Sequence, residues 1–174
     1  MDERIYGLLG RKLGHSWSVP IHAALGNGAY RLLELEPDGL APFLHRKDIG
    51  GLNVTIPYKK AVVSCCGELS EAAERLQSVN TLVRRPDGTL YGDNADAYGF
   101  DAMVKASGIS VEGKKALVLG SGGASATVCA VLNELRARSV TVISRSGEDN
   151  YGNLDRHADA EIIVNTTPVG MYPN

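Results

Sequence analysis

The sequence predicts an α/β fold made of two successive α/β units. Apolar runs of strand length alternate with helix-forming segments along the whole chain. Several of these runs are almost continuously apolar, as in strands that are buried on both faces of a parallel sheet. The alternation begins again near residue 115, after a helix predicted over residues 96–107. We therefore predict that this helix links two parallel α/β units.

In the first half, apolar and β-branched residues predict the strands. Clusters of strong helix formers, such as Ala23 and Ala24, predict the helices. The segment Pro86-Asp87-Gly88-Thr89 has the composition of a turn and predicts a reversal between two strands. The predicted strands span residues 4–9, 30–35, 51–56, 80–85 and 90–92, and the predicted helices span residues 21–26, 39–47 and 71–76.

In the second half, the same reasoning predicts strands over residues 115–119, 139–143 and 161–165, and a helix over residues 126–136. Three strands are fewer than a doubly wound domain uses to bury both of its faces. We therefore predict an incomplete second domain whose last strand has an exposed edge, and such edges favour self-association. The predicted domains are residues 1–98 and residues 99–174.

The composition argues against several classes of protein. The formal net charge is −2, so the chain lacks the basic surface of a nucleic-acid-binding protein. No apolar run reaches the length of a membrane span, and the N-terminus lacks the regions of a signal peptide. The three cysteines have no Cys-x-x-Cys spacing, and the four histidines have no metal-ligand spacing. We expect a cytoplasmic protein with reduced cysteines, no bound metal, and neither a nucleic-acid nor a membrane partner.

A glycine-rich segment, Gly120-Ser121-Gly122-Gly123-Ala124-Ser125, joins the first strand of the second half to a helix. This context is typical of dinucleotide-binding domains of the Rossmann type, although a plain glycine-rich turn is the alternative. Gly120 permits the tight turn, and Gly122 lets the backbone approach a pyrophosphate. The N–H groups of the helix from Gly123 onward face the phosphates. Ser125 replaces the usual third glycine and is small enough for close helix–strand packing.

The next strand ends in Ser144-Arg145-Ser146. An NAD-binding domain places an acidic residue here to accept hydrogen bonds from the ribose hydroxyls. A guanidinium instead binds a 2′-phosphate, and neighbouring hydroxyls can assist it. The segment therefore favours NADP over NAD, although Glu148 lies close by in the sequence. A solvated loop arginine is the alternative interpretation.

Polar residues of the first half gather where strands end. Ser16 and Ser18 follow the first strand, and an extended backbone there would point both hydroxyls the same way, so that they can hold a carboxylate. Lys59 follows the third strand, Asn80 lies at a strand start, and Asp96 follows the last strand. Ligands of open α/β sheets bind at the carboxyl ends of strands, so we expect these residues to converge. Taken singly, each also has a structural interpretation as a turn serine, a solvated lysine or a helix N-cap.

These polar segments occur in a characteristic order along the chain, and a dinucleotide-binding motif follows them. With this arrangement the sequence resembles shikimate dehydrogenase over essentially all 174 residues. The resemblance implies an N-terminal α/β substrate domain, which binds shikimate, followed by an incomplete Rossmann-like dinucleotide-binding domain, which binds NADP. The motifs that carry it are His15-Ser16-x-Ser18, Asn53-Val54-Thr55-x-Pro57-x-Lys59, Val79-Asn80-Thr81, Gly92-x-Asn94-x-Asp96, the Gly120 loop and Asn165-Thr166-Thr167-Pro168-x-Gly170-Met171.

The resemblance also implies roles for single residues. Ser16 and Ser18 hold the substrate carboxylate, and Thr55 and Asn80 contact substrate hydroxyls. The expected cofactor-binding residues are Gly120, Gly122, Gly123, Ser125, Ser144, Arg145 and Ser146.

Lys59 and Asp96 are the catalytic pair that the resemblance implies, and their chemistry suits the reaction. Reduction of a ketone requires a hydride and a proton for the developing alkoxide. An ammonium such as Lys59 can stabilise that charge and donate the proton. A carboxylate such as Asp96 favours the charged amine and fixes its position. The predicted activity is the reversible NADP-dependent reduction of 3-dehydroshikimate to shikimate, in the biosynthesis of aromatic amino acids.

The sequence departs from the family pattern at four points. Val19 separates Ser18 from Pro20, Ala95 stands where threonine is usual, and no second basic residue follows Arg145. Members of the family continue well beyond residue 174, where they complete the cofactor sheet and return a helix with a glutamine to the substrate. We therefore expect this chain to be an N-terminal piece. Three alternatives stay open: a quinate/shikimate dehydrogenase that uses NAD, a non-catalytic shikimate-binding module, and an inactive fragment.

Overall fold

The computed structural model describes residues 4–14 and 16–170. Its contacts divide the chain into two compact units, Met1–Ala95 and Asp96–Asn174. The predicted domain boundary between residues 98 and 99 falls inside helix α4 (Ala95–Ser107) and stays a prediction. Among the described residues, no helix is long and apolar enough to cross a membrane. The same residues contain no group of three or more His, Cys, Asp and Glu side chains placed to hold a metal ion.

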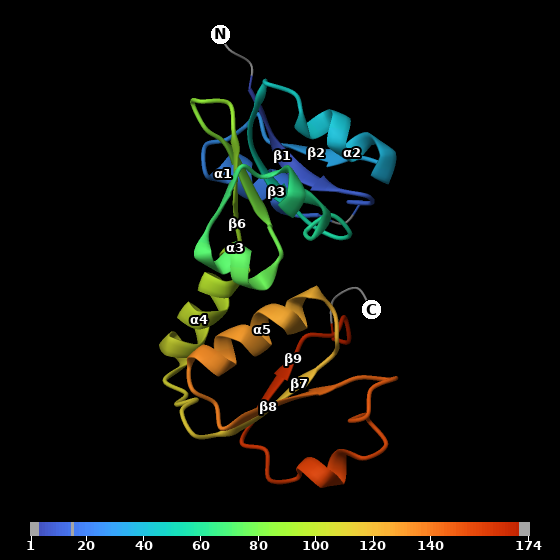
Figure 1. Cartoon of the computed structure of the whole chain (residues 1–174), viewed down its shortest axis with the longest axis vertical. Coiled ribbons are helices and arrows are strands. Elements are labelled where there is room, and N and C mark those ends of the chain that lie inside the picture. Colours follow the sequence, from blue (N-terminus) through green and yellow to red (C-terminus); the bar gives the residue numbers. More distant parts are fainter. Residues whose placement is uncertain (1–3, 15, 171–174) are drawn as a thin grey trace. The chain divides into compact units, whose positions relative to one another are not determined.

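The first unit contains a six-stranded sheet in the order β2-β1-β3-β5-β6-β4 (Figure 1). Its strands are β1 (Ile5–Gly10), β2 (Arg31–Glu34), β3 (Ile49–Val54), β4 (Glu68–Leu69), β5 (Thr81–Arg84) and β6 (Leu90–Asp93). β1 is parallel to β2 and β3, whereas β5 is antiparallel to β3 and β6. The parallel pairing predicted for this unit is found for β1, β2 and β3, whereas β5 is antiparallel to β3. The reversal predicted over residues 86–89 is confirmed, since a tight turn there joins β5 and β6 as an antiparallel hairpin.

Two helices of the first unit start earlier than predicted. Helix α1 spans Ser18–Ala24 and helix α2 spans Pro37–Leu44, whereas the predictions began at residues 21 and 39. Each has a proline in its first turn, Pro20 in α1 and Pro37 in α2. A proline is tolerated there because the first N–H groups of a helix have no intrahelical partner. The other helices of this unit are the 3₁₀ helix η1 (Ala61–Cys65) and α3 (Glu71–Leu76), and α3 has the predicted limits.

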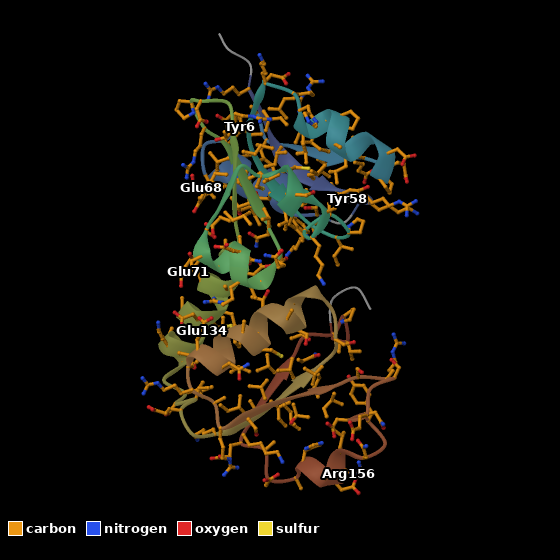
Figure 2. The ribbon with its side chains drawn as sticks, in the orientation of Figure 1. Tyr6, Tyr58, Glu68, Glu71, Glu134 and Arg156 are labelled. Carbon is orange, nitrogen blue, oxygen red and sulfur yellow. The ribbon has the colours of Figure 1, made fainter. Side chains whose placement is uncertain are left out.

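The strands of the first unit are held by one apolar core. Leu9, Ile49 and Leu82, from three neighbouring strands, are completely buried in it. The ring of Tyr6, labelled in Figure 2, lies so close to Gly50 that a Cβ at position 50 would be 2.5 Å from a ring carbon. This packing fixes β1 against β3, and with them the loops that follow both strands.

The second unit contains a three-stranded parallel sheet, as predicted, and the order of its strands is β8-β7-β9. Helix α5 lies along one side of this sheet, and the segment that contains η2 lies on the other side (Figure 1). Right-handed crossover connections require this arrangement. Ala116 and Val118 pack with Val128 and Leu132 in the core of this unit. Besides α4, its elements are β7 (Lys115–Leu119), α5 (Gly123–Glu134), β8 (Ser139–Ile143), the 3₁₀ helix η2 (Leu154–His157) and β9 (Ile162–Asn165).

Strand β9 forms an edge of this sheet, since within the described residues it pairs with β7 alone. Its Ile163 side chain is 65% exposed. We expect the amide hydrogens of β9 to exchange faster than those of β3, which lies between β1 and β5, because a strand with one free edge opens at lower cost. Hydrogen exchange followed by mass spectrometry on dilute protein measures this. Equal protection of β3 and β9 in a monomer would contradict the expectation.

Candidate active site

The polar segments of the first unit meet at one edge of its sheet. β1 and β3 are parallel, so their carboxyl ends share an edge. β5 is antiparallel to β3 and β6 is antiparallel to β5, so the start of β5 and the end of β6 reach the same edge. The N–H of Thr55 donates to the carbonyl of Leu9 at 2.9 Å, and the N–H of Val54 donates to the carbonyl of Asn80 at 2.8 Å. The N–H of Asn80 in turn donates to the carbonyl of Asp93 at 2.9 Å, so backbone hydrogen bonds join all four strand ends.

The two serines lie in the loop after β1. The Ser16 hydroxyl donates to the Ser18 hydroxyl at 3.1 Å, and the N–H of Ser18 donates to Ser16 Oγ at 3.2 Å. Both side chains are half-buried. The hydroxyls are adjacent, but the extended backbone predicted for them is wrong: Trp17 has φ −87° and ψ 2°, and Ser18 begins helix α1. A turn that ends in a helix brings them together. His15 of the same motif lies outside the described residues.

Lys59 lies in a turn that directly follows β3. The N–H of Tyr58 donates to the carbonyl of Thr55 at 2.9 Å, and the N–H of Val79 donates to the carbonyl of Lys59 at 2.8 Å. Tyr58, labelled in Figure 2, is 3% exposed and anchors the turn in the core. Because Thr55 already belongs to this turn, β3 ends at Val54, two residues before the predicted end. The turn gives the half-buried Lys59 a fixed backbone beside the start of β5.

Asn80 connects the start of β5 to the start of α4. Its side chain is 8% exposed, and its Oδ1 accepts hydrogen bonds from the N–H of Ala95 at 2.9 Å and from the Thr81 hydroxyl at 3.1 Å. Within the described part of the chain, the amide nitrogen of Asn80 donates to no protein group, so it is available to a ligand. Asp96 comes directly after Ala95, is exposed, and is the first residue of the second unit.

Asp93 and Asn94, which belong to the motif that ends in Asp96, have structural roles. The Asp93 carboxylate accepts hydrogen bonds from the Ser70 hydroxyl at 2.5 Å and from the N–H of Asn94 at 2.7 Å. Asn94 is completely buried, and its amide donates to the carbonyl of Ser78 at 2.9 Å. These bonds hold the chain in place just before Asp96.

Sequence reasoning missed a buried pair beside this edge. The Tyr30 hydroxyl donates to Asn53 Oδ1 at 2.7 Å, and the Tyr30 ring stacks on His22 with 3.6 Å between the ring centroids. Burial raises the pKa of Tyr30 to about 12, so the hydroxyl keeps the proton that it donates to Asn53 even in moderately alkaline solution. No sequence pattern links these residues, because His22 lies in α1, Tyr30 lies just before β2 and Asn53 lies in β3.

Two cavities open at opposite edges of the first sheet. One, of about 630 Å³, lies at the edge described above, and the other, of about 780 Å³, lies at the opposite edge. The larger cavity is lined by residues such as Lys47, Arg84 and Gly88 and contains none of the predicted site residues. The smaller cavity is lined by Arg11, Lys12, Thr55, Ile56 and Pro57, and so includes a predicted site residue, Thr55. The chemistry of the lining residues, and not the size of the cavity, therefore identifies the candidate site.

The glycine-rich turn lies at the carboxyl end of β7. Gly120 has φ +105°, and a Cβ there would lie 2.9 Å from the Thr166 hydroxyl, so the position requires glycine. Helix α5 begins at Gly123, as the glycine-rich motif predicts, although the helix-forming pattern begins only at residue 126, and Gly122 is its N-cap. A Cβ on either glycine would meet nothing within 4 Å, so an anion can approach the first N–H groups of the helix. Ser125 is 3% exposed and donates its N–H to the carbonyl of Gly122, which suits packing and not contact with a cofactor.

The second predicted cofactor segment directly follows β8. The N–H of Gly120 donates to the carbonyl of Ile143 at 2.8 Å, which places the glycine-rich turn beside the end of β8. Ser144 is half-buried, whereas Arg145 and Ser146 are exposed. The two cofactor segments are therefore neighbours at the carboxyl edge of the second sheet.

Comparison with known proteins identifies the family. A family model described as the shikimate dehydrogenase substrate binding domain matches residues 8–82. A shikimate dehydrogenase (NADP(+)) from Clostridium perfringens is 34% identical over 192 residues, and the match covers 98% of this chain and 70% of the relative. The chain belongs to the shikimate dehydrogenase family. The family predicted from the motifs is thereby confirmed.

Solved structures of shikimate dehydrogenases share the fold. The chorismate mutase/shikimate 5-dehydrogenase fusion protein of Clostridium acetobutylicum is 35% identical with a TM-score of 0.88, over 99% of this chain and 69% of that protein. The shikimate 5-dehydrogenase of Thermus thermophilus, solved in complex with NADP(H) and shikimate, is 32% identical with a TM-score of 0.81, over 96% of this chain and 69% of that protein. The predicted α/β fold is thereby confirmed, and this chain spans about 70% of the length of such shikimate dehydrogenases.

Proposed function

We propose that this protein catalyses the reversible, NADP-dependent reduction of 3-dehydroshikimate to shikimate, a step in the biosynthesis of aromatic amino acids. The observation that carries the proposal is the gathering of the Ser16–Ser18 hydroxyl pair, Thr55, Lys59 and Asn80 at one edge of the first sheet. The family relationship supports it, since the matched relatives are named shikimate dehydrogenase (NADP(+)). The cytoplasmic location stays a prediction.

The substrate is proposed to bind through its carboxylate and its hydroxyls. The hydroxyls of Ser16 and Ser18 are adjacent, 3.1 Å apart, and the Ser16 hydroxyl donates to Ser18 Oγ. When a carboxylate binds, the Ser16 proton can turn from Ser18 to the ligand, so that each hydroxyl donates to one carboxylate oxygen. The unused amide nitrogen of Asn80 and the half-buried hydroxyl of Thr55 suit the ring hydroxyls of the substrate. Asn80 is held by its bond to Ala95, so it keeps its orientation before the substrate arrives.

The proton is proposed to come from Lys59. NADPH, when bound, supplies a hydride to the carbonyl carbon. The ammonium of Lys59 donates a proton to the carbonyl oxygen as negative charge develops there, and it takes the proton back in the direction of shikimate oxidation. The Asp96 carboxylate is proposed to accept a hydrogen bond from a substrate hydroxyl.

NADP is proposed to bind at the carboxyl edge of the second sheet. The open N-terminus of α5 at Gly122 and Gly123 suits the pyrophosphate. The exposed guanidinium of Arg145, with the hydroxyls of Ser144 and Ser146, suits the 2′-phosphate. Gly120 shapes the turn that joins these two places.

Initial rates with shikimate and with quinate, each with NADP and with NAD, test the proposal. The assay is run on the 174-residue chain and, where its gene encodes more, on the complete product. We expect oxidation of shikimate with NADP to be the fastest of the four reactions. Faster oxidation of quinate with NAD would favour the quinate/shikimate dehydrogenase alternative. Binding of shikimate without turnover in either protein would favour the non-catalytic binding module.

Replacement of Ser18 by alanine is expected to raise KM for shikimate by about tenfold or more and to leave kcat nearly unchanged, because a hydrogen bond to a charged group contributes about 1.5–3 kcal/mol. Steady-state kinetics measure both constants. The methyl ester of shikimate, which has no carboxylate charge, is the control substrate. An equal effect on shikimate and on its ester would show that Ser18 does not bind the carboxylate.

A further inference from the structure

The segment between β8 and β9 contains a half-buried polar pair, Asp149 and His157, that the proposed mechanism does not use. We propose that His157 is a positioning residue that sets the preference for NADP over NAD: it binds the carboxylate of Asp149 and so holds the loop that presents Arg145. The inference rests on the proposed function, because it assumes that Arg145 binds the 2′-phosphate. Figure 2 labels Arg156, the residue before His157, in the 3₁₀ helix η2.

Asp149 closes the loop that carries Arg145. Its backbone carbonyl accepts a hydrogen bond from the N–H of Ser144 at 3.2 Å, so residues 144 and 149 are joined and residues 145–148, which include Arg145, form the exposed part between them. Its carboxylate Oδ1 lies 2.7 Å from His157 Nε2. A carboxylate only accepts hydrogen bonds, so Nε2 carries the proton and donates. Asp149 therefore fastens the base of the loop to η2.

Hydrogen bonds, and not apolar packing, hold this segment. Tyr151 and Leu154 are 45% and 37% exposed, so the segment buries little apolar surface. Asn153 donates its amide to the carbonyl of Glu148 at 2.9 Å, and its Oδ1 accepts from the N–H of Asn150 at 2.8 Å. A loop that depends on polar contacts loses its shape when a central contact is removed. The link between Asp149 and His157 is partly buried, since the side chains of His157 and Asp149 are 12% and 32% exposed.

The environment of His157 points to a role beyond packing. Within the described part of the chain, its Nδ1 is buried without a hydrogen-bond partner. Such an atom costs free energy, and an apolar side chain of similar size would avoid that cost. A histidine at this position is worth that cost in free energy if its hydrogen bond to Asp149 is needed to hold the loop that carries Arg145.

That bond also keeps an acidic group away from the cofactor. In NAD-binding domains, an acidic residue near this place accepts hydrogen bonds from the ribose hydroxyls, and the same charge repels a 2′-phosphate. Asp149 lies four residues after Arg145, and the bond to His157 directs its carboxylate into the segment. Loss of the bond would release both the loop and a negative charge, and both effects weaken binding of the 2′-phosphate.

Calorimetric titration with adenosine 2′,5′-bisphosphate and with ADP tests the proposal, because only the first ligand has the 2′-phosphate. We expect His157→Phe to weaken binding of the bisphosphate by about tenfold and to leave ADP binding within about twofold of wild type. His157→Gln, whose amide can still donate to Asp149, should recover most of the loss. Arg156→Gln, at the exposed neighbouring residue, is the matched control and should change neither affinity.

The outcomes distinguish a failure of the role proposed for His157 from a failure of the proposed 2′-phosphate site. If Arg145→Met lowers the affinity for the bisphosphate and His157→Phe does not, the role of His157 is refuted and the function stands. If Arg145→Met also leaves the bisphosphate affinity unchanged, the proposed 2′-phosphate site itself fails. Equal weakening of both ligands by His157→Phe would show a general loss of structure and would overturn the inference. Should His157→Phe not fold, the comparison of His157→Gln with Asp149→Ala replaces it, and the inference requires that only Asp149→Ala lose the preference for the bisphosphate.

Discussion

Replacement of Lys59 by alanine is expected to lower kcat for shikimate oxidation by about 10²–10⁴-fold, which is the usual contribution of general acid–base catalysis. KM for shikimate should change much less, because Ser16, Ser18, Thr55 and Asn80 hold the substrate independently of the lysine. The backbone of Lys59 is fixed by its bond to Val79, so the substitution removes the ammonium and leaves the turn in place. Steady-state kinetics with shikimate and NADP measure the two constants separately.

Lys60 provides a matched control for this experiment. It is the next residue, is exposed, and carries the same charge. Lys60→Ala should therefore retain nearly all activity, which separates a specific effect of Lys59 from a change in the local electrostatic field. If Lys59→Ala raised KM as strongly as it lowered kcat, Lys59 would be mainly a binding residue, and the proposed proton transfer would be wrong.

Replacement of Arg145 by methionine is expected to raise KM for NADP by about 10–100-fold, because a charge-assisted hydrogen bond contributes about 1.5–3 kcal/mol. KM for NAD should stay the same or fall, since NAD has no 2′-phosphate to lose a partner. Methionine keeps much of the length of the side chain but removes the charge and every donor. The ratio of kcat/KM for the two cofactors is the measured quantity.

Arg138→Met is the control for Arg145. Arg138 is also exposed but precedes β8, at the end of the strand opposite to Arg145. The same change of charge there should leave the cofactor preference as it is. A fall in kcat/KM by the same factor for NADP and NAD in the Arg145 variant would remove the specific role assigned to the guanidinium.

The sequence predicted elements best where the local pattern and the tertiary packing agree. Residues 115–119 and 139–143 are mostly apolar runs that form neighbouring strands of a parallel sheet, and both strands have the predicted limits. The first sheet is mixed because the hairpin at residues 86–89 determines the direction of β5 and β6, and the pairing of β5 with β3 depends on packing between distant segments. Local propensity has no information about such pairing.

The candidate site was predictable where residue type and position along a strand suffice. The glycine at position 120 and the polar residues at strand ends are such cases. The adjacency of Ser16 and Ser18 was expected for the wrong reason, since it arises from a turn and a helix start. The contact between Asp149 and His157 was not predictable, because two polar residues in an irregular segment show no periodicity from which to infer proximity.

The most direct test of the proposed function is to locate the site at which shikimate binds. Backbone amide chemical shifts in ¹⁵N-labelled protein, recorded during titration with shikimate, map the site residue by residue. We expect the largest changes at Ser16, Ser18, Thr55, Lys59 and Asn80, which share one edge of the first sheet. Changes centred instead on Lys47, Arg84 and Gly88, in the cavity at the opposite edge, would contradict the proposed function.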